Sequence, residues 1–214
     1  LMTGAEQEYF LIKKDVYAKR FDLKTVGRIL LGGKPIKNQE DNHHYFGMIE
    51  DEISVVMNEI DKVLWSIGIT AKLQHNEVAP MQYELVPIYT NANVANDHNQ
   101  IIMDVITRVA NKHGYVALFE EKPFYFTNGS GKHLNWSLIT DTNVNLFDVK
   151  GDKDIFYTFY TAMVMAVDEF NDLITLSTSY YSNEFRLGGA EAPPKIVSLF
   201  VSDYILDYLM HVNY

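Results

Sequence analysis

The sequence predicts a single domain of the α/β or α+β class. Segments with the alternation of strands and segments with helical spacing follow one another in mixed order along the 214 residues, which is the pattern of these two classes. No linker rich in Pro, Gly or Ser divides the sequence, and 47% hydrophobic residues are enough for one packed core. We therefore expect one domain over residues 1–214.

The expected strands and helices are set by the spacing of apolar residues. In the first strand, residues 6–12, alternation puts Glu6 and Glu8 on one face and Tyr9 and Leu11 on the other. Residues 16–42 are expected to form a loop that could hold one short strand. Further strands are predicted at 70–74, 115–119 and 134–139. Helices are predicted at 49–67, at 95–112, at 154–175 (buried, because it has few charges) and at 195–211.

The composition excludes several classes of function. The formal net charge is −10 and no block of Lys and Arg offsets it, so neither nucleic acid nor an anionic membrane is an expected partner. No apolar run approaches the roughly 20 residues of a membrane span. The chain has no cysteine, which excludes thiolate metal sites and fits a cytoplasmic protein. Such an acidic chain suits the binding of cations, or of an anionic substrate together with a metal ion.

Residues 75–89 carry the first chemical signal. They are predicted to fold back on themselves around Pro80 and Met81, with Glu77 and Glu84 three residues to either side. In a two-residue hairpin these glutamates would be direct neighbours, with Cβ atoms roughly 5 Å apart, and they would repel each other unless a cation lay between them. The segment also fits an exposed hairpin with two unrelated acids, because Pro is not the usual residue of such a turn.

Three further residues complete a set of candidate ligands. Glu6 and Glu8 share one face of the first strand, and His133 follows a glycine-rich turn. Acidic oxygens with one imidazole and no sulfur suit Mg²⁺ or Mn²⁺ better than Zn²⁺. Each residue alone also fits an ordinary position, either on a solvated strand face or in a loop. The other histidines show no ligand spacing and are expected to be structural or exposed: His43, His44, His75, His98, His113 and His211.

Two glycine-containing loops could bind anions. The turn at residues 128–132 is not a P-loop, because Phe126 stands where the first glycine is required and His133 where Ser or Thr is required. It could still bring backbone N–H groups close to a small polar ligand. Arg186 could clamp an anion, and Glu191 lies on a loop with glycines before it and two prolines after it. That layout is typical of a mobile flap, although an ordinary surface loop has it too.

Taken together and in order, six segments resemble the glutamine synthetases, most closely the type III form. They are residues 4–11 (GAEQEYFL), 42–47 (NHHYFG), 75–85 (HNEVAPMQYEL), 95–100 (ANDHNQ), 128–133 (NGSGKH) and 186–194 (RLGGAEAPP). The resemblance covers essentially the whole chain, and the ordered set is specific although each motif alone is less so. It implies an α+β fold of the glutamine synthetase/guanido kinase-like type, with a curved, mostly antiparallel sheet flanked by helices.

The resemblance implies an ATP-dependent ligase that joins ammonia to glutamate through a γ-glutamyl phosphate, with two Mg²⁺ or Mn²⁺ ions. By motif, Glu8, Glu77 and Glu84 correspond to the ligands of the first metal, which touches the substrate glutamate and the transferring phosphate. Glu6 and His133 correspond to two of the three protein ligands of the second metal, which serves the nucleotide.

The remaining site residues follow from the same resemblance. Asn128 and Gly129 match the loop that holds the substrate glutamate, and Arg186 matches an arginine that binds its carboxylate. Glu191 matches the flap glutamate that closes the site and helps take a proton from ammonium. The nucleotide contacts fall on Asn135 and Ser137.

The sequence also departs from the family pattern. Met81, Phe185 and Ala190 replace residues that are usually small or polar, His and Asn, respectively. These changes favour a non-catalytic relative, whereas five candidate ligands favour an enzyme; a γ-glutamyl ligase for another amine is the alternative within the fold. Neither the N-terminal β-grasp domain nor the Arg-x-Glu-x-Arg strand of the family is present. We therefore expect a catalytic domain that is incomplete at both ends and inactive alone, from a large ring-shaped homo-oligomer.

Overall fold

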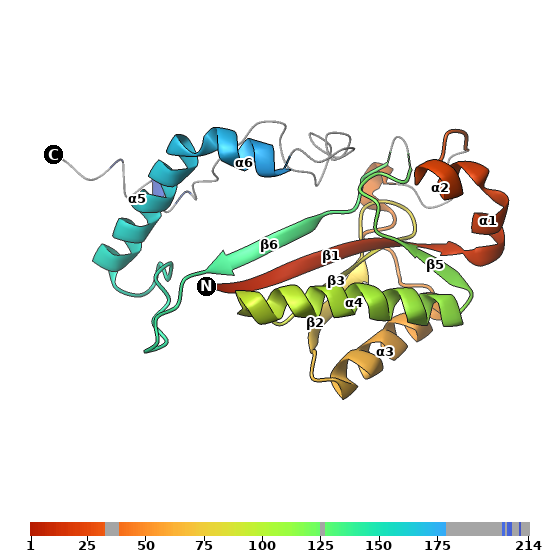
Figure 1. The fold of residues 1–214 in the computed structure, drawn as a ribbon, viewed down its shortest axis with the longest axis horizontal. Coiled ribbons are helices and arrows are strands. Elements are labelled where there is room, and N and C mark those ends of the chain that lie inside the picture. Colours follow the sequence, from red (N-terminus) through yellow and green to blue (C-terminus); the bar gives the residue numbers. More distant parts are fainter. Residues whose placement is uncertain (33–38, 125–126, 179–202, 204, 207–209, 211–214) are drawn as a thin grey trace.

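The computed structural model describes residues 1–32, 39–124 and 127–178, together with Asp203, Ile205, Leu206 and Met210. Over these residues the chain forms a six-stranded sheet with helices along it (Figure 1). The class is the predicted mixture of strands and helices, and every described strand pairing is antiparallel. No helix in the described ranges combines the length and the apolar character needed to cross a membrane.

Strand β1 (Met2–Lys13) is the centre of the sheet and contains the predicted strand at 6–12. On one edge it pairs with β3 (Gln82–Pro87) and β4 (Thr90–Asn91), and on the other with β5 (Tyr115–Leu118) and β6 (Lys132–Ser137). Strand β2 (Ala71–Asn76) adds to the outer edge of β3. Because β1 contacts four strands, residues far apart in the sequence meet along it.

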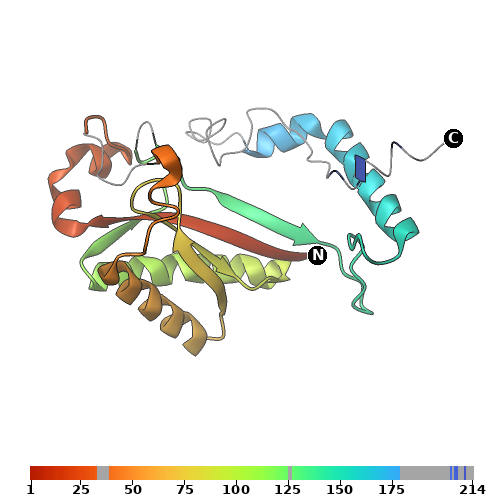
Figure 2. The ribbon, with the colours of Figure 1, turned by 180° about the vertical axis from the view of Figure 1, so that it is seen from behind.

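Two amphipathic helices cover one face of the sheet. Helix α3 (Asp51–Ser66) and helix α4 (Ala92–Lys112) confirm the predictions at 49–67 and 95–112. Helix α4 begins earlier than predicted because the Asn91 side chain accepts a hydrogen bond from the Asn93 N–H and caps the helix. Figures 1 and 2 show α4 running along β1 from opposite sides.

The main core lies between this face and the two helices. It is built from fully buried side chains of β1, β3, α3 and α4: Tyr9, Leu11, Leu85, Ile53, Ile60, Leu64, Ile102 and Ile106. Each such aliphatic side chain contributes about 1.5–3 kcal/mol by leaving water. Phe10, which points to the other face of β1, belongs to a second, smaller cluster with Leu23. The predicted alternation along β1 is therefore confirmed.

The expectation of a loop over residues 16–42 is wrong in its first half. Two short helices, α1 (Lys14–Lys19) and α2 (Phe21–Val26), follow β1, and α2 ends at Gly27, whose φ of 69° is the left-handed conformation that glycine adopts without strain. A 3₁₀ turn, η1 (Glu40–Asn42), comes later. Helices of six residues are too short to show an apolar period.

The long aromatic helix predicted at 154–175 is divided at Phe170 into α5 (Lys153–Glu169) and α6 (Asn171–Thr178). The prediction that it is buried is wrong: Phe156 is the buried residue of α5, and Met165 is 63% exposed. Helix α5 lies beyond the end of β6, and α6 turns back from it (Figure 1). A low charge therefore did not imply burial here. Most of the helix predicted at 195–211 lies outside the described residues, and its four described residues are helical.

Candidate metal centre

A row of three ligand-type side chains crosses the sheet on the face opposite to α3 and α4. Glu8 on β1 lies directly opposite Glu84 on β3, and Glu84 lies directly opposite His75 on β2. Residues opposite each other in antiparallel strands point to the same face with Cβ atoms about 5 Å apart. Glu77, which follows the end of β2, completes a group that we name the inner cluster: Glu8, His75, Glu77 and Glu84.

The register of the β2–β3 hairpin differs from the predicted one. Glu77 N–H donates to the carbonyl of Gln82 (2.9 Å), and His75 rather than Glu77 lies opposite Glu84. The predicted direct pairing of the two glutamates is therefore wrong. Because the register is shifted by two residues, both glutamates still lie on the predicted face, since side-chain direction repeats every two residues. The two carboxylates do come together, as diagonal neighbours with His75 between them.

The turn explains the shift. It is a four-residue loop, residues 78–81, closed by the Gln82 N–H bonded to the Ala79 carbonyl at 3.1 Å. The Gln82 side chain closes it further, since its Oε1 accepts from the Ala79 N–H at 3.2 Å. Met81 takes a left-handed φ of 60°. A two-residue turn at Pro80 and Met81 would have required positive φ at its first position, which proline cannot adopt.

Glu8 is held in place by donors from two distant segments. Its Oε2 accepts from Gln82 Nε2 at 2.9 Å and from the Gly131 N–H at 2.8 Å. Gln82 Nε2 also donates to the Gly129 carbonyl at 3.0 Å. The glycine-rich turn therefore brings a backbone N–H to the Glu8 carboxylate, and contact of this turn with a small polar ligand stays a prediction. Only 7% of Glu8 is exposed.

His75 lies between the other two carboxylates. Its Nε2 is 2.8 Å from Glu84 Oε2, and its Nδ1 is 3.5 Å from Glu77 Oε1. The hydrogen bond with Glu84 is the main reason that the pKa of His75 is raised to about 9. Burial, followed by the charges of Glu8 and Glu84, raises the pKa of Glu77 to about 8. The inner cluster thus concentrates negative charge in a place that water reaches poorly.

The donor atoms are arranged as a cation would require. His75, Glu77 and Glu84 each offer one ligand atom, and these atoms all lie within 4.8 Å of one another; no other group of three such residues in the described ranges does so. His75 was not among the predicted ligands, because only the pairing of β2 with β3 brings its side chain next to Glu84. One local signal was available: it lies two residues before Glu77, and therefore on the same side of an extended segment.

Residues 42–47 hold the end of β2 in position. His44 Nδ1 lies 2.7 Å from the carbonyl of Glu77, and Asn76 Nδ2 donates to the carbonyls of His44 at 3.0 Å and Gly47 at 2.9 Å. A Cβ at Gly47 would lie 2.7 Å from a backbone carbonyl in this segment, so only glycine fits the turn. The Tyr45 ring packs edge-on against the His75 ring, with centroids 5.9 Å apart.

A second pair of predicted ligands meets at the edge of the sheet. Glu6 on β1 lies opposite His133 on β6, with Nδ1 of the histidine 3.2 Å from Glu6 Oε2. Asn135 Nδ2 donates to Glu6 Oε1 at 2.7 Å. We name Glu6 and His133 the edge pair. Since Glu6 and Glu8 are two residues apart on β1, the edge pair lies about 7 Å along the strand from the inner cluster.

The other predicted site residues are placed as follows. The loop at 128–129 touches the inner cluster through the Gly129 carbonyl and Gln82, and the Asn128 N–H donates to Gln39 Oε1 at 2.6 Å. Ser137 donates to Asn145 Oδ1 and lies on the same face of β6 as His133. Arg186 and Glu191 lie outside the described residues.

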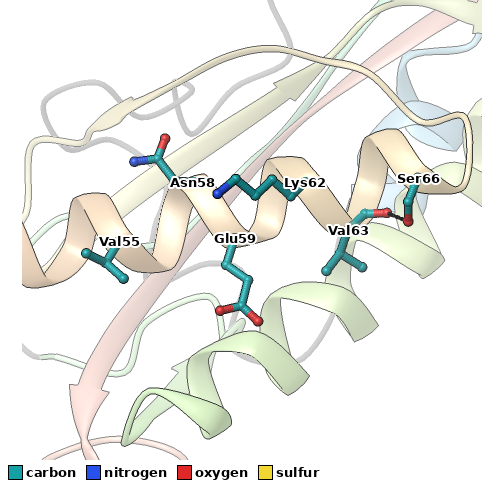
Figure 3. A pocket seen from close by; sticks show the side chains of 6 residues that line it. All are labelled: Val55, Asn58, Glu59, Lys62, Val63 and Ser66. Carbon is teal, nitrogen blue, oxygen red and sulfur yellow. Dashed lines mark hydrogen bonds between the residues drawn. The ribbon is translucent and has the colours of Figure 1, made fainter.

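An open hollow on α3 is separate from this centre (Figure 3). It is lined by Val55, Asn58, Glu59, Lys62, Val63 and Ser66. Its one acidic residue, Glu59, already pairs with Lys112 and His113 of α4, at 2.6 and 2.7 Å. The hollow therefore offers no set of free ligands, and the inner cluster and His133 lie elsewhere on the described part of the chain.

The fold and the site define a class: an α+β domain with a cluster of carboxylates and imidazoles on one sheet face. The family model described as glutamine synthetase, catalytic domain, matches residues 1–196. A glutamine synthetase of Butyrivibrio fibrisolvens is 50% identical over 213 residues, which are 98% of this chain and 30% of that protein. A type-3 glutamine synthetase of Dictyostelium discoideum is 47% identical over 201 residues, which are 92% of this chain and 27% of that protein.

A solved structure, the cryo-EM structure of Plasmodium falciparum glutamine synthetase, matches the fold with a TM-score of 0.66 at 21% identity, over 87% of this chain and 39% of that one. The chain belongs to the family of glutamine synthetase catalytic domains. The family predicted from the ordered motifs is thereby confirmed, and so is the fold class. The chain spans about 30% of the length of the curated relatives that it matches.

Proposed function

We propose that this chain is part of the catalytic domain of an ATP-dependent ligase that joins ammonia to glutamate. The observation that carries the proposal is the inner cluster, where Glu8, Glu84 and His75 face one another across three strands beside Glu77. Membership of the glutamine synthetase family supports it. The alternative of a non-catalytic relative has no need for two buried carboxylates, Glu77 and Glu84, with oxygens within 4.8 Å of each other.

The donor set fits the divalent ions that the family implies. Glu8, Glu77 and Glu84 would hold the first ion, and Glu6 with His133 would hold the second. The buried like charges of the inner cluster, expressed in the raised pKa of Glu77, are relieved by a cation. When bound, Mg²⁺ or Mn²⁺ neutralises charge on the transferring phosphoryl group and on the glutamate carboxylate.

The chain's own residues position the substrates around these ions. The 128–129 loop, tied to Glu8 through Gln82, would hold glutamate beside the inner cluster. Asn135 and Ser137, on the face of β6 that carries His133, would contact ATP. The γ-carboxylate takes the phosphoryl group and ADP leaves; ammonia then forms the C–N bond and phosphate leaves. Arg186 would bind the glutamate carboxylate, and Glu191 would take the proton from ammonium.

The proposal extends to the complete protein. Because the chain spans about 30% of its curated relatives, we propose that residues 1–214 form part of a larger catalytic domain. We further propose that the complete protein is a ring-shaped homo-oligomer in the cytoplasm. The residues described here would then supply the ligands of the first ion and two ligands of the second.

The test is an assay of the complete protein for phosphate release that requires glutamate, ammonia and ATP together. Wild type is compared with Glu84→Gln, which removes one charge from the inner cluster, and with Glu59→Gln as a matched control on α3. We expect activity in wild type and control and none in Glu84→Gln. Turnover that responds to another amine but not to ammonia would change the assigned substrate. Full activity in Glu84→Gln would refute the proposed site.

A further inference from the structure

We propose that His75 is a direct ligand of the ion at the inner cluster, and that it makes this position prefer Mn²⁺ or another transition-metal ion over Mg²⁺. This inference rests on the proposed function, because it concerns the same ion. It goes further by adding a nitrogen ligand to a position that resemblance to the family assigns to three carboxylates. Four observations carry it: the hydrogen bond of His75 Nδ1, the direction of its Nε2, the donor spacing and the support of its ring.

The tautomer is set by the backbone. His75 Nδ1 lies 2.8 Å from the carbonyl of Asn76, and a carbonyl can only accept, so Nδ1 carries the proton. A histidine that ligates a metal almost always donates its other ring N–H to a carbonyl or carboxylate in this way, which fixes the ring and frees one lone pair. Nε2 is therefore the ring nitrogen that is left to bind an ion.

The other ring nitrogen points into the cluster. Nε2 lies 2.8 Å from Glu84 Oε2, so a proton shared between these two atoms holds the pair together. A divalent ion that takes the place of this proton can bind both atoms. Glu77 and Glu84 direct their oxygens to the same point, where the three ligand atoms lie within 4.8 Å.

The spacing needs little adjustment. Ligand atoms at about 2.1 Å from an ion lie roughly 3–4 Å from one another, so the group is close to a binding geometry before an ion enters. Strand pairing with Glu84 and the edge-on contact with Tyr45 keep the imidazole from turning away. The His75 ring is therefore already held in the orientation that binding an ion would require.

The choice of ion follows from ligand chemistry. Mg²⁺ prefers oxygen ligands, whereas imidazole nitrogen suits transition ions. A position with three carboxylates alone would accept either. Adding the His75 nitrogen favours the transition ion, so removing the imidazole should weaken Mn²⁺ binding much more than Mg²⁺ binding.

The first experiment is isothermal titration of the complete protein with Mn²⁺ and with Mg²⁺. His75→Gln is compared with wild type and with His113→Gln, a matched control whose imidazole pairs with Glu59 on the other face of the sheet. We expect Mn²⁺ affinity to fall about 10-fold or more in His75→Gln while Mg²⁺ affinity changes less than about 3-fold, and no change in the control. An equal fall for both ions would overturn the proposal.

The second experiment does not depend on the folding of a His75 variant. Pulsed electron paramagnetic resonance of one equivalent of Mn²⁺ detects ¹⁴N nuclei bound to the ion. In His133→Gln, which removes the imidazole of the edge pair, the ¹⁴N signal should persist, and it should disappear when His75→Gln is added. Absence of the signal in His133→Gln would overturn the inference.

The two proposals fail in different ways. If Mn²⁺ binds, if Glu84→Gln abolishes that binding and if His133→Gln shows no ¹⁴N signal, then His75 is not a ligand and the proposed function stands. If Glu84→Gln binds Mn²⁺ as wild type does, the inner cluster is not the site and both proposals fall.

Discussion

The inner cluster and the edge pair are built from the same residue types, and each includes one glutamate from the same face of β1, yet they differ in burial and in their hydrogen bonds. At the inner cluster, Glu8, Glu77 and Glu84 are each at most 8% exposed. At the edge pair the side chains of His133 and Glu6 are 44% and 27% exposed. Glu8 is fixed by Gln82 and a backbone N–H, whereas Glu6 is met by the partly exposed side chains of its neighbours.

The difference shows that burial decides whether the charge of a carboxylate must be neutralised by a bound proton or cation. Water and salt screen the charge of an exposed glutamate, and a contact such as Glu6 with His133 is worth about 0–1 kcal/mol. Three buried glutamates cannot be screened in this way, so either a proton or a cation must neutralise them. On β1, Glu8 therefore belongs to a buried group that needs a proton or a cation for neutralisation. Glu6, about 7 Å away, belongs to an exposed pair that can bind a cation but does not need one.

The largest expected effect separates the two positions directly. Glu84→Gln keeps the shape of the side chain but removes the charge that lies opposite both Glu8 and His75. We expect Mn²⁺ affinity to fall about 100-fold or more, since even loss of an outer-shell partner costs 10–100-fold. Isothermal titration measures it, with Glu59→Gln as a control that also removes one glutamate charge. Equal affinity in Glu84→Gln and the control would show that the two positions do not differ as described.

The second prediction concerns the support of the inner cluster. Asn76→Ala removes the donor of a buried hydrogen bond to the carbonyl of His44 and of a partly buried one to the carbonyl of Gly47. We expect a loss of about 2 kcal/mol, seen as a melting temperature lower by about 6 °C, together with Mn²⁺ binding weakened about 10-fold.

The matched control is Asn99→Ala. Asn99 is also buried, but it bonds Gln7 on the side of the sheet that faces α4. This variant should lose stability and keep its Mn²⁺ affinity. If both variants bind Mn²⁺ like wild type, then residues 42–47 stabilise the fold without positioning the cluster.

Sequence reasoning succeeded where a signal is local. The alternation in β1 and the apolar stripes of α3 and α4 repeat within a few residues, so the strand, the two helices and their buried faces could be predicted. The carboxylates could be selected because the motifs occur in family order. Glu6 and His133 were predicted as ligands of one ion, and the structure places them opposite each other.

The predictions that were wrong share a different cause. Each depended on a contact between particular side chains, or between residues far apart in the sequence, that no local pattern reveals. The hairpin register depends on Gln82 bonding Ala79, and no propensity reveals that bond. His75 became part of the site only through pairing with β3. The burial of α5 could not be read from its low charge, because burial depends on a packing partner and only Phe156 has one that buries it.

The third prediction uses pH. The folded chain holds the Glu77 proton until about pH 8, whereas a free glutamate releases it near 4.5; for His75 the corresponding values are about 9 and 6.5. Both pKa values are raised on folding, so the stability that the protons contribute is complete below the unfolded pKa and is lost as the pH rises through the folded pKa. We expect the metal-free melting temperature to fall by about 4 °C between pH 6.5 and 9, for 1–2 kcal/mol.

Thermal melts in a chelator measure this slope. Glu77→Gln, which resembles the protonated carboxyl at every pH, should flatten it. Glu59→Gln, which removes a half-buried glutamate that pairs with Lys112 and His113 of α4, should not. Excess Mn²⁺ should remove the fall in wild type, because the ion replaces the lost protons. A slope that is the same in Glu77→Gln and wild type would mean that the inner cluster does not store the repulsion that we assign to it.

The smallest effect belongs to the edge pair. Glu6→Gln removes the carboxylate that contacts His133 and Asn135, but the glutamine can keep the bond from Asn135, and the ion pair is partly exposed. We expect a change of less than about 0.5 kcal/mol, below about 2 °C in melting temperature, and no change in the tighter Mn²⁺ equivalent measured by titration. A large loss of stability, or weaker binding of the tighter equivalent, would show that Glu6 and Glu8 act as one site in spite of their separation. The contrast between a buried and an exposed position on β1 would then have to be abandoned.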